Sequence, residues 1–181
     1  MIPAHYLELI EPLDGVSSML ELGNKRGTGG PGDTYKRHFE ALGLRHVSVD
    51  WNGEDGALAL DLQKPLGLGA FDMVTNIGTS EHVEDQAGVW RNIVEAADRL
   101  IVCITPRPGD WPGHGLHYPR PEFYRQLAIL NGFDVERLYE AGPSGRAFVY
   151  ARLRRSERRL GGFKMPGAAT MTAAPPRRPR P

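Results

Sequence analysis

The sequence predicts a single α/β domain built on an open, mostly parallel β-sheet. Short apolar runs, which are typical of strands buried on both faces, alternate with segments of helical periodicity. This alternation implies right-handed crossovers between parallel strands, and two final strands joined by a Gly/Pro turn imply an antiparallel end to the sheet. The 181 residues, of which 40% are hydrophobic, suit one domain with an ordinary core.

Four apolar runs mark the central strands of this sheet. They cover residues 18–22, 46–50, 71–77 and 99–104. A weaker run at 57–61 adds one strand, and residues 133–139 and 147–153 form the closing hairpin through the turn at 142–145. We therefore expect a sheet of seven strands in which the last strand is antiparallel.

Three helices are predicted between these strands. Residues 33–42 begin with a capping aspartate and end at a glycine, and residues 86–97 carry apolar side chains at helical spacing. Residues 122–130 form the third helix and are followed by an Asn-Gly pair. A loop rich in Gly, Pro and His, residues 107–121, precedes this third helix.

Charge divides the chain into a folded part and a tail. From Arg152 onward nine Lys and Arg residues accompany one acid, Glu157, so this end carries about +8 and the rest about −8. An acidic core is a poor partner for nucleic acid phosphates. We expect a domain over residues 1–155 and a disordered basic tail over 156–181, which makes at most weak contact with nucleic acid or another acidic partner.

The N-terminus and the cysteine content predict a cytoplasmic protein. Residues 1–15 lack the basic region and apolar run of a signal peptide. The single cysteine, Cys103, cannot form an internal disulfide. The apolar run at 100–104 is far shorter than the roughly 20 residues that span a bilayer, so we expect no membrane association.

Candidate ligand-binding residues follow the first strand, at the sheet edge where open α/β folds bind ligands. These are Glu21, Gly23, Asn24 and Gly27. The glycines allow the backbone to turn tightly beside a ligand, and the next helix offers free amides to anionic groups. A flexible Gly-rich connection with no ligand is an equally good interpretation of this loop alone.

Two aspartates after later strands suit a nucleoside. Asp50 can accept hydrogen bonds from ribose hydroxyls, and the adjacent Trp51 can cover an adenine face. Asp61, which precedes Leu62, can accept a hydrogen bond from an adenine amino group. A turn or capping role for Asp50 and a surface-loop role for Asp61 are the alternatives.

The third central strand leads into a further candidate segment. Asn76 and Gly78 lie where the reacting end of a cofactor is expected, and Glu81 and His82 can line a substrate entrance. A helix N-terminus capped by Ser80 is the structural alternative.

Taken in order, these segments resemble the class I S-adenosylmethionine-dependent methyltransferase family of small-molecule type. Glu21-x-Gly23 resembles its first motif, Asp50 its ribose-binding acid, and Asp61-Leu62 its adenine-binding pair. The stretches 71–74 and 80–83 resemble the pattern "FD-hydrophobic…EHV" of small-molecule members, and 101–106 resembles its strand ending in proline. The match covers about residues 15–153.

The resemblance implies a Rossmann-like three-layer sandwich, a sheet in the order 3-2-1-4-5-7-6, and S-adenosyl-L-methionine as cofactor. One residue departs from the family's pattern, because Lys25 stands where a second glycine is usual. We expect Lys25 and Arg26 to point outward, or Lys25 to pair with the cofactor's carboxylate.

The resemblance also implies methyl transfer to a small-molecule hydroxyl or amine. A general base helps with such acceptors, and His82, His114 and His117 are the candidates. Trp111 and Tyr118, together with Glu81, are candidate substrate contacts. Two histidines three residues apart in a Gly-rich loop have no further ligands of clear spacing, so we predict no metal site.

Other functions fit the sequence less well. A nicotinamide-dependent oxidoreductase lacks its G-x-G-x-x-G motif here, and Asp33 replaces the essential lysine of a phosphate-binding loop. Residues 76–79 differ from the Asp/Asn-Pro-Pro motif of DNA amino-methyltransferases, and Cys103 lies in an apolar strand rather than at a reactive position. The alternatives left open are the oxidoreductase and a non-catalytic binding or assembly module with a methyltransferase-like fold.

Overall fold

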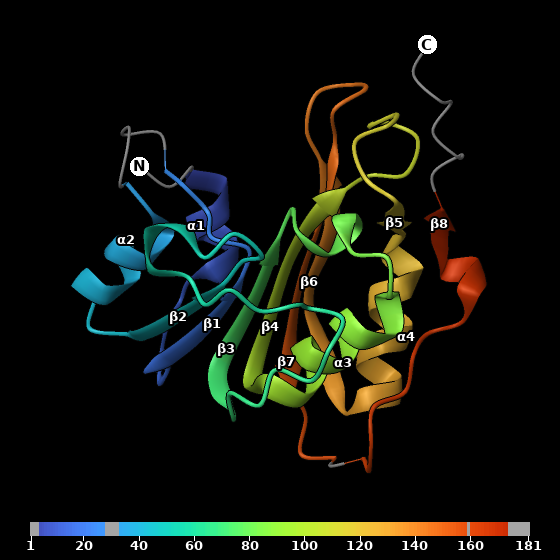
Figure 1. Cartoon of the computed structure of the whole chain (residues 1–181). Helices are drawn as coiled ribbons and strands as arrows, with labels where there is room; N and C mark the ends of the chain where they lie inside the picture. Colours follow the sequence, from blue (N-terminus) through green and yellow to red (C-terminus); the bar gives the residue numbers. More distant parts are fainter. Residues whose placement is uncertain (1–3, 28–32, 159, 174–181) are drawn as a thin grey trace.

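The computed structural model describes residues 4–27, 33–158 and 160–173 and places them around a six-stranded sheet (Figure 1). In chain order the elements are α1 (Ala4–Ile10), β1 (Ser18–Leu22), α2 (Tyr35–Ala41), β2 (Arg45–Val49), η1 (Glu54–Gly56), β3 (Phe71–Ile77), η2 (Ser80–His82), α3 (Gln86–Ala96), β4 (Ala97–Pro106), β5 (His117–Pro119), α4 (Pro121–Asn131), β6 (Phe133–Ala141), β7 (Phe148–Arg155), η3 (Ala168–Thr170) and β8 (Met171–Ala173). The sheet order is β2-β1-β3-β4-β7-β6.

The sheet is parallel except at its hairpin end. β1 pairs in parallel with β2 and β3, and β3 pairs in parallel with β4. β7 lies antiparallel between β4 and β6, as the Gly/Pro turn between the last two strands predicted. The predicted α/β class and the antiparallel last strand are confirmed.

The prediction of a seventh strand at residues 57–61 is wrong for the described chain. This segment makes a single isolated parallel bridge, between Val49 and Leu58, and forms no strand. The side chain of Leu58 is 41% exposed and Ala59 is exposed as well, so the segment lacks an apolar face to bury at the sheet edge. The sheet therefore lacks the first strand of the expected order 3-2-1-4-5-7-6 and has six strands.

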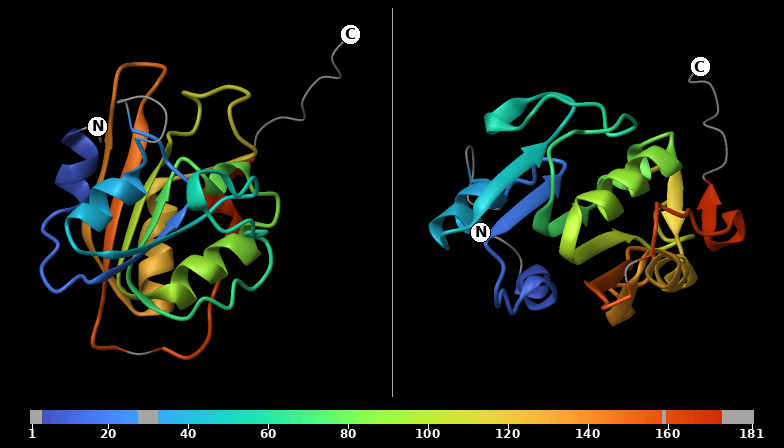
Figure 2. Two further views of the ribbon diagram at one scale, coloured as in Figure 1. Left: turned by 60° about the vertical axis from the view of Figure 1, so that its left-hand side comes forward. Right: turned by 90° about the horizontal axis from the view of Figure 1, so that it is seen from below.

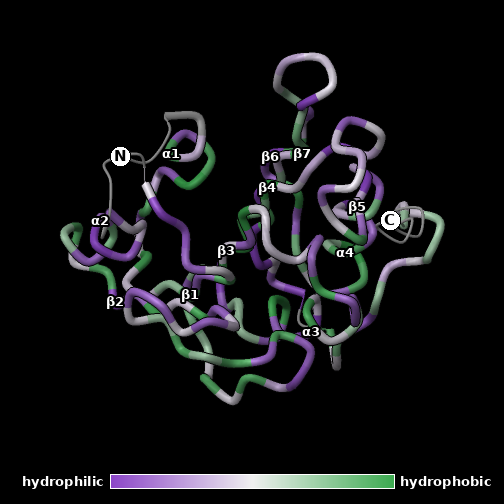
Figure 3. Tube along the Cα trace, turned by 45° about the horizontal axis from the view of Figure 1, so that its top comes forward, coloured by the Kyte–Doolittle hydropathy of each residue, from purple (hydrophilic) through white to green (hydrophobic). Residues whose placement is uncertain are grey.

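Alternate side chains of the strands fill two cores on opposite faces of the sheet. Leu20, Val74 and Ile101 pack in the core that includes α3 and α4, whereas their neighbours Met19 and Met73 pack in the core that includes α1 and α2. This alternation follows from the period of two in a strand. In Figure 3, α1 and α2 carry both hydrophilic and hydrophobic residues, as expected of helices that cover one face of a sheet.

Helix α1, which was not predicted from the sequence, is held against the sheet by a buried arginine. Arg152 on β7 is 2% exposed, and its guanidinium donates to the carbonyls of Leu9 at 2.9 Å, Glu11 at 3.0 Å and Pro12 at 3.0 Å, and also to that of Ile10. These carbonyls lie at the end of a helix, where intrahelical partners are lacking. The arginine therefore replaces the missing helical bonds and fixes the N-terminal helix.

The described residues beyond 155 pack on the domain, which corrects the prediction of a disordered tail starting at 156. β8 pairs antiparallel with β5, as Figure 2 shows at the side of the molecule, and Phe163 and Met165 pack against the core under α4. Asn131 accepts from the backbone amide of Lys164 at 2.8 Å and donates to its carbonyl at 2.9 Å. The few apolar side chains of this segment are enough to hold it in place because they pack on a core that other residues form. Residues 174–181 of the predicted tail lie outside the described part of the chain.

Within the described part of the chain, no helix is long and apolar enough to cross a lipid bilayer.

Cys103 is fully buried on β4, where burial raises the pKa of its thiol. A thiol in this state is inert packing.

Candidate functional site

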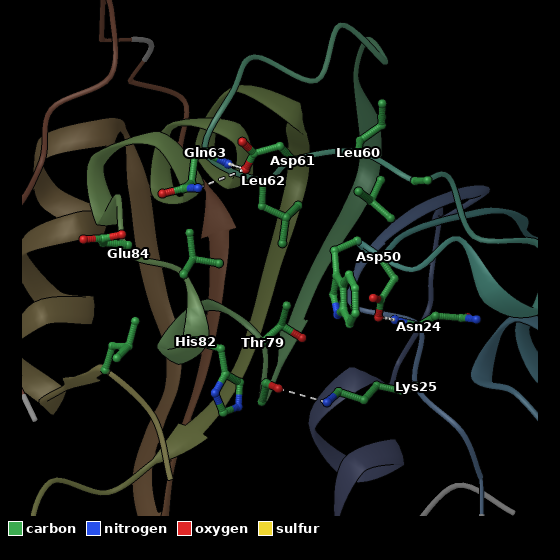
Figure 4. Close-up of a pocket in the computed structure, with 17 residues that line it drawn as sticks. Asn24, Lys25, Asp50, Leu60, Asp61, Leu62, Gln63, Thr79, His82 and Glu84 are labelled. Atoms are coloured by element: carbon green, nitrogen blue, oxygen red, sulfur yellow. Dashed lines mark hydrogen bonds between the residues drawn. The ribbon is translucent and has the colours of Figure 1, made fainter. Parts of the chain in front are cut away.

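A cavity of about 700 Å³ opens at the carboxyl ends of β1, β2 and β3 (Figure 4). Parallel strands end at one edge of the sheet, so the loops that follow them are brought together there. The lining includes these predicted cofactor residues: Gly23, Asn24, Asp50, Trp51, Asp61, Leu62 and Gly78. Lys25 lines it as well, together with residues that were not predicted from the sequence: Leu60, Gln63, Thr79, Val83, Glu84 and Leu116.

Asp50 closes β2 and is turned toward the loop after β1. Its Oδ2 accepts from the backbone amide of Asn24 at 3.0 Å, and its Oδ1 accepts from that of Asn52 at 3.4 Å. The side chain of Trp51 is 86% exposed at the rim of the cavity. A large aromatic group left open to water beside a carboxylate offers a flat apolar surface to a ligand ring.

Asp61 lies at the opposite end of the cavity and is held by its own loop. Its Oδ1 accepts from the backbone amide of Gln63 at 2.9 Å and from that residue's side-chain amide at 3.2 Å (Figure 4). These two bonds lower the pKa of Asp61 and keep it ionised. The neighbouring Leu62 is 9% exposed and packs in the core, so it fixes the loop from beneath.

Gly23 allows β1 and β3 to end in close contact. Its φ is 77°, and a Cβ placed on it would lie 2.3 Å from Oγ1 of Thr79. That hydroxyl donates to the carbonyl of Leu22 at 2.8 Å, which ties the loop after β3 to the end of β1. A glycine is therefore required here for both backbone conformation and space.

Lys25 bridges the loops after β1 and β3. Its Nζ donates to the carbonyl of Gly78 at 2.9 Å, which corrects the expectation that it points outward (Figure 4). Arg26 does point outward and pairs with Glu54 at 2.8 Å and Asp55 at 3.0 Å. The one lysine that departs from the family's pattern thus places its ammonium group inside the site.

Three predicted cofactor residues support the loops from outside this cavity. Glu21 is fully buried, and its Oε1 accepts from the amide of Lys25 at 3.2 Å, while its Oε2 lies 3.3 Å from Nε2 of His46. Burial raises the pKa of Glu21, and His46 opposes that shift. Asn76 is buried and bonds Ser80 through both atoms of its amide, and the amide of Gly27 donates to the carbonyl of Asp33 at 2.6 Å.

A second cavity of about 410 Å³ adjoins the first and shares Lys25, Gly78 and His82 with it. Its walls are largely aromatic and apolar. They comprise Tyr6 of α1, Tyr35 of α2, Ile77, Ile104, Phe148 and the predicted substrate residue Trp111. Glu81 and His114 complete the lining together with Arg26. Tyr6, Tyr35 and Phe148 were not found from the sequence, because no local pattern links them to the strand ends.

A carboxylate and two imidazoles meet where the two cavities join. Oε1 of Glu81 lies 3.8 Å from Nε2 of His82 and 3.6 Å from Nε2 of His114. The Glu81 side chain is fully buried, whereas His82 and His114 are 46% and 40% exposed. Burial raises the pKa of Glu81 to about 7, and Lys25 opposes the shift. Burial, with a smaller contribution from Lys25, lowers the pKa of His114.

The loop before β5 holds His114 in this position. Nε1 of Trp111 donates to the carbonyl of Ala147 at 2.7 Å, and the amide of Leu116 donates to the carbonyl of Glu81 at 2.7 Å. A Cβ placed on Gly115 would lie 2.9 Å from that same carbonyl of Glu81. The loop can approach Glu81 this closely only because residue 115 has no side chain.

Two other predicted residues of this loop lie elsewhere. His117 is half-buried on β5, opposite Ala173 of β8, and lines neither cavity. The hydroxyl of Tyr118, a buried residue, donates to the carbonyl of Trp111 at 2.8 Å and accepts from the amide of Gly115 at 2.8 Å. Tyr118 thus fixes the loop from inside and, like His117, does not line either cavity.

Comparison with known proteins bears on the fold. No protein-family model matches the chain, and no curated protein matches it. Among solved structures it is similar to a 1,6-didemethyltoxoflavin-N1-methyltransferase of Burkholderia thailandensis with bound 1,6-didemethyltoxoflavin and S-adenosylhomocysteine. That alignment has a TM-score of 0.60 and 17% identity, and it covers 84% of this chain and 76% of the other.

Two further structures give the same result. The N-methyltransferase NodS of Bradyrhizobium japonicum WM9, in complex with S-adenosylhomocysteine, aligns with a TM-score of 0.55 and 13% identity over 84% of this chain and 86% of its own. Magnesium protoporphyrin IX methyltransferase of Synechocystis PCC 6803, with bound S-adenosylmethionine, aligns with a TM-score of 0.52 and 16% identity over 84% and 77%. The chain therefore has the fold of the S-adenosylmethionine-dependent methyltransferases, as the resemblance in sequence implied.

Proposed function

We propose that the protein binds S-adenosyl-L-methionine in the larger cavity and transfers its methyl group to a small molecule held in the smaller one. The observation that carries this proposal is the pair of adjoining cavities at the carboxyl edge of the sheet, which share Lys25, Gly78 and His82. When bound, the cofactor supplies an electrophilic methyl group on a sulfonium. The protein's task in such a displacement is to align donor and acceptor, and alignment accounts for most of the rate.

The larger cavity has complementary groups for each end of the cofactor. Asp50 offers carboxylate oxygens to ribose hydroxyls and Trp51 an open ring face to adenine, with Asp61 at the far end of the same cavity. The ammonium of Lys25 lies at the opposite side, beside Gly78, where it suits the carboxylate of the cofactor's amino-acid end. In this interpretation the ammonium of Lys25 forms an ion pair with the cofactor's carboxylate, at a position where the family usually has a glycine.

The smaller cavity suits an acceptor that has an apolar ring and a hydroxyl or amine. Tyr6, Trp111 and Phe148 offer aromatic surface, and Glu81 with the two histidines supplies a polar end close to the shared residues. A hydroxyl or protonated amine must lose a proton when it is methylated. The polar end of the cavity is therefore where we place the reacting atom of the acceptor.

Calorimetric titration of the full chain with S-adenosylhomocysteine tests the cofactor site. We expect 1:1 binding, and we expect Asp50→Asn to raise the Kd by about tenfold, because a charged hydrogen bond becomes a neutral one, a difference of about 1.4 kcal/mol. Asp98→Ala, which removes an exposed carboxylate on β4 outside the cavity, is the matched control and leaves Kd unchanged.

The same titration separates the rival functions. Binding of NADH without S-adenosylhomocysteine supports a nicotinamide-dependent oxidoreductase, and binding of neither supports a non-catalytic module. Methylation assays with labelled cofactor then test the acceptor class. Transfer of label to nucleic acid but to no metabolite fraction contradicts a small-molecule acceptor.

A further inference from the structure

We propose that Glu81, His82 and His114 bind a divalent transition-metal ion of the Zn²⁺ type at the junction of the two cavities. The sequence predicted no metal site, because the two histidines of the loop 107–121 have no further ligands of regular spacing. The structure supplies the companions from a different segment, since η2 brings Glu81 and His82 beside His114. His117, the other histidine of that loop, is on β5 and takes no part.

The donor atoms have the spacing that a shared ion needs. One carboxylate oxygen and one nitrogen of each imidazole lie within 4.8 Å of one another. The distances from Oε1 of Glu81 to Nε2 of His82 and of His114 are 3.8 and 3.6 Å. Ligand atoms around a tetrahedral Zn²⁺ with bonds of about 2.0–2.1 Å lie roughly 3.4 Å apart. Small rotations of these side chains are enough to shorten the observed distances to that value. A set of two imidazoles and one carboxylate favours Zn²⁺, Mn²⁺ or Fe²⁺ over Mg²⁺ and Ca²⁺.

Glu81 gives an independent indication that the cluster has a ligand. Both of its carboxylate oxygens are buried, and neither has a hydrogen-bond partner in the described part of the chain. A buried carboxylate without such bonds is costly unless a cation or a metal compensates it. A metal ion between Glu81 and the histidines provides that compensation.

The surrounding structure holds the ligands in place. The carbonyl of Glu81 accepts from Leu116 at 2.7 Å, which ties η2 to the loop that bears His114, and Trp111 lies against the His114 ring at 5.3 Å between centroids. The ammonium of Lys25 donates to the carbonyl of Gly78 at 2.9 Å and offsets the buried charge of Glu81 only in part.

This site also specifies the acceptor, an inference that rests on the proposed function. Three protein ligands leave a position open on the ion, and the partly exposed histidines leave it accessible from the aromatic cavity. A hydroxyl bound there has a lowered pKa and releases its proton to solvent. Its oxygen then forms the new O–C bond as the S–C bond of the methyl donor breaks, so we infer an aromatic hydroxyl compound as the acceptor class.

Metal binding is measured on the tag-free full chain after dialysis against EDTA, with no cofactor present. Titration with Co²⁺, followed by its visible absorption, is expected to saturate at one equivalent, and Zn²⁺ is expected to displace it. His114→Ala and Glu81→Gln should each weaken binding by at least about tenfold, the scale of losing even an outer-shell partner. His117→Ala is the matched control and should bind like the unaltered chain.

The outcomes distinguish this inference from the proposed function. Less than one equivalent of Co²⁺ at about 100 μM protein, or equal binding by the His114→Ala variant, overturns the metal site. Because His114 lies on a partly exposed loop, its variant tests the site even where Glu81→Gln does not fold. Failure to bind S-adenosylhomocysteine by a chain that does bind metal refutes the cofactor proposal alone.

Discussion

Replacement of Arg152 by methionine is expected to detach helix α1 from the sheet. The guanidinium donates to four consecutive carbonyls from Leu9 to Pro12 and contacts Glu136 at 2.8 Å while being 2% exposed. Methionine fills much of the same volume but offers no donor. Carbonyls at the end of α1 and the carboxylate of Glu136 then lose their partner together.

The expected loss of stability is about 3–5 kcal/mol, the range found when one partner of a buried charged network is removed. Hydrogen bonds to charged groups contribute about 1.5–3 kcal/mol each, so a larger loss would follow if water did not reach the freed carbonyls. For a domain of this size, each kcal/mol shifts Tm by about 2–4 °C, which gives a decrease of roughly 6–20 °C.

Urea unfolding and calorimetry measure this change, and Arg154→Met is the matched control. Arg154 contacts the same carboxylate from the same strand, but it is 40% exposed and reaches no carbonyl of α1. We expect the control to lose less than about 1 kcal/mol, as exposed ion pairs do. A loss of the same small size for Arg152→Met would refute the view that this side chain anchors α1.

The same variant has a functional consequence. Tyr6 of α1 lines the smaller cavity, whereas no residue of α1 lines the larger one. Binding of S-adenosylhomocysteine should therefore persist in the folded variant while acceptor turnover falls. Equal loss of both would show that α1 supports the whole site rather than the acceptor side.

The remaining predictions concern the loop, the sheet and the C-terminal segment. Gly115→Ala should cost about 1–3 kcal/mol, because its Cβ would lie 2.9 Å from the carbonyl of Glu81, and it should weaken Co²⁺ binding; an unaltered titration would contradict the packing argument. Burial opposes ionisation of Asp72, but hydrogen bonds from Ser17 and Ser18 outweigh burial and lower the pKa of Asp72. The ionised carboxylate therefore stabilises the fold above the unfolded-state pKa of about 3.9, and this contribution is lost as pH falls below that value. Asp72→Asn should then lower the free energy of unfolding at pH 7 and flatten its dependence on pH below about 4, which urea titrations at each pH will show or refute. Phe163→Ala should lower the free energy of unfolding by about 1–2 kcal/mol, less than the loss expected at a fully buried phenylalanine. An unchanged Tm would mean that the C-terminal segment does not contribute to the core.

The class of fold, and the edge of the sheet at which the site lies, follow from local features of the sequence. Short apolar runs specify parallel strands, and polar residues that follow such strands must meet at one edge whatever the rest of the chain does. For this reason Gly23, Asp50 and Gly78 were predicted near one another and do line one cavity. Asp61 lines the same cavity, although the segment before it forms no strand. Helix ends were also readable, because caps are local: Gly132 ends α4 with a φ of 72°.

The residues beside that edge come together through contacts between distant segments. Tyr6, Glu81 and His114 come from three distant segments, and no local pattern relates a loop histidine to a carboxylate more than thirty residues earlier. The direction of Lys25 depended on whether the carbonyl of Gly78 was within reach, and the folding of the segment around Phe163 depended on a core built by other residues. Such contacts are set by long-range packing rather than by local propensity, so periodicity and capping rules contain no information about them.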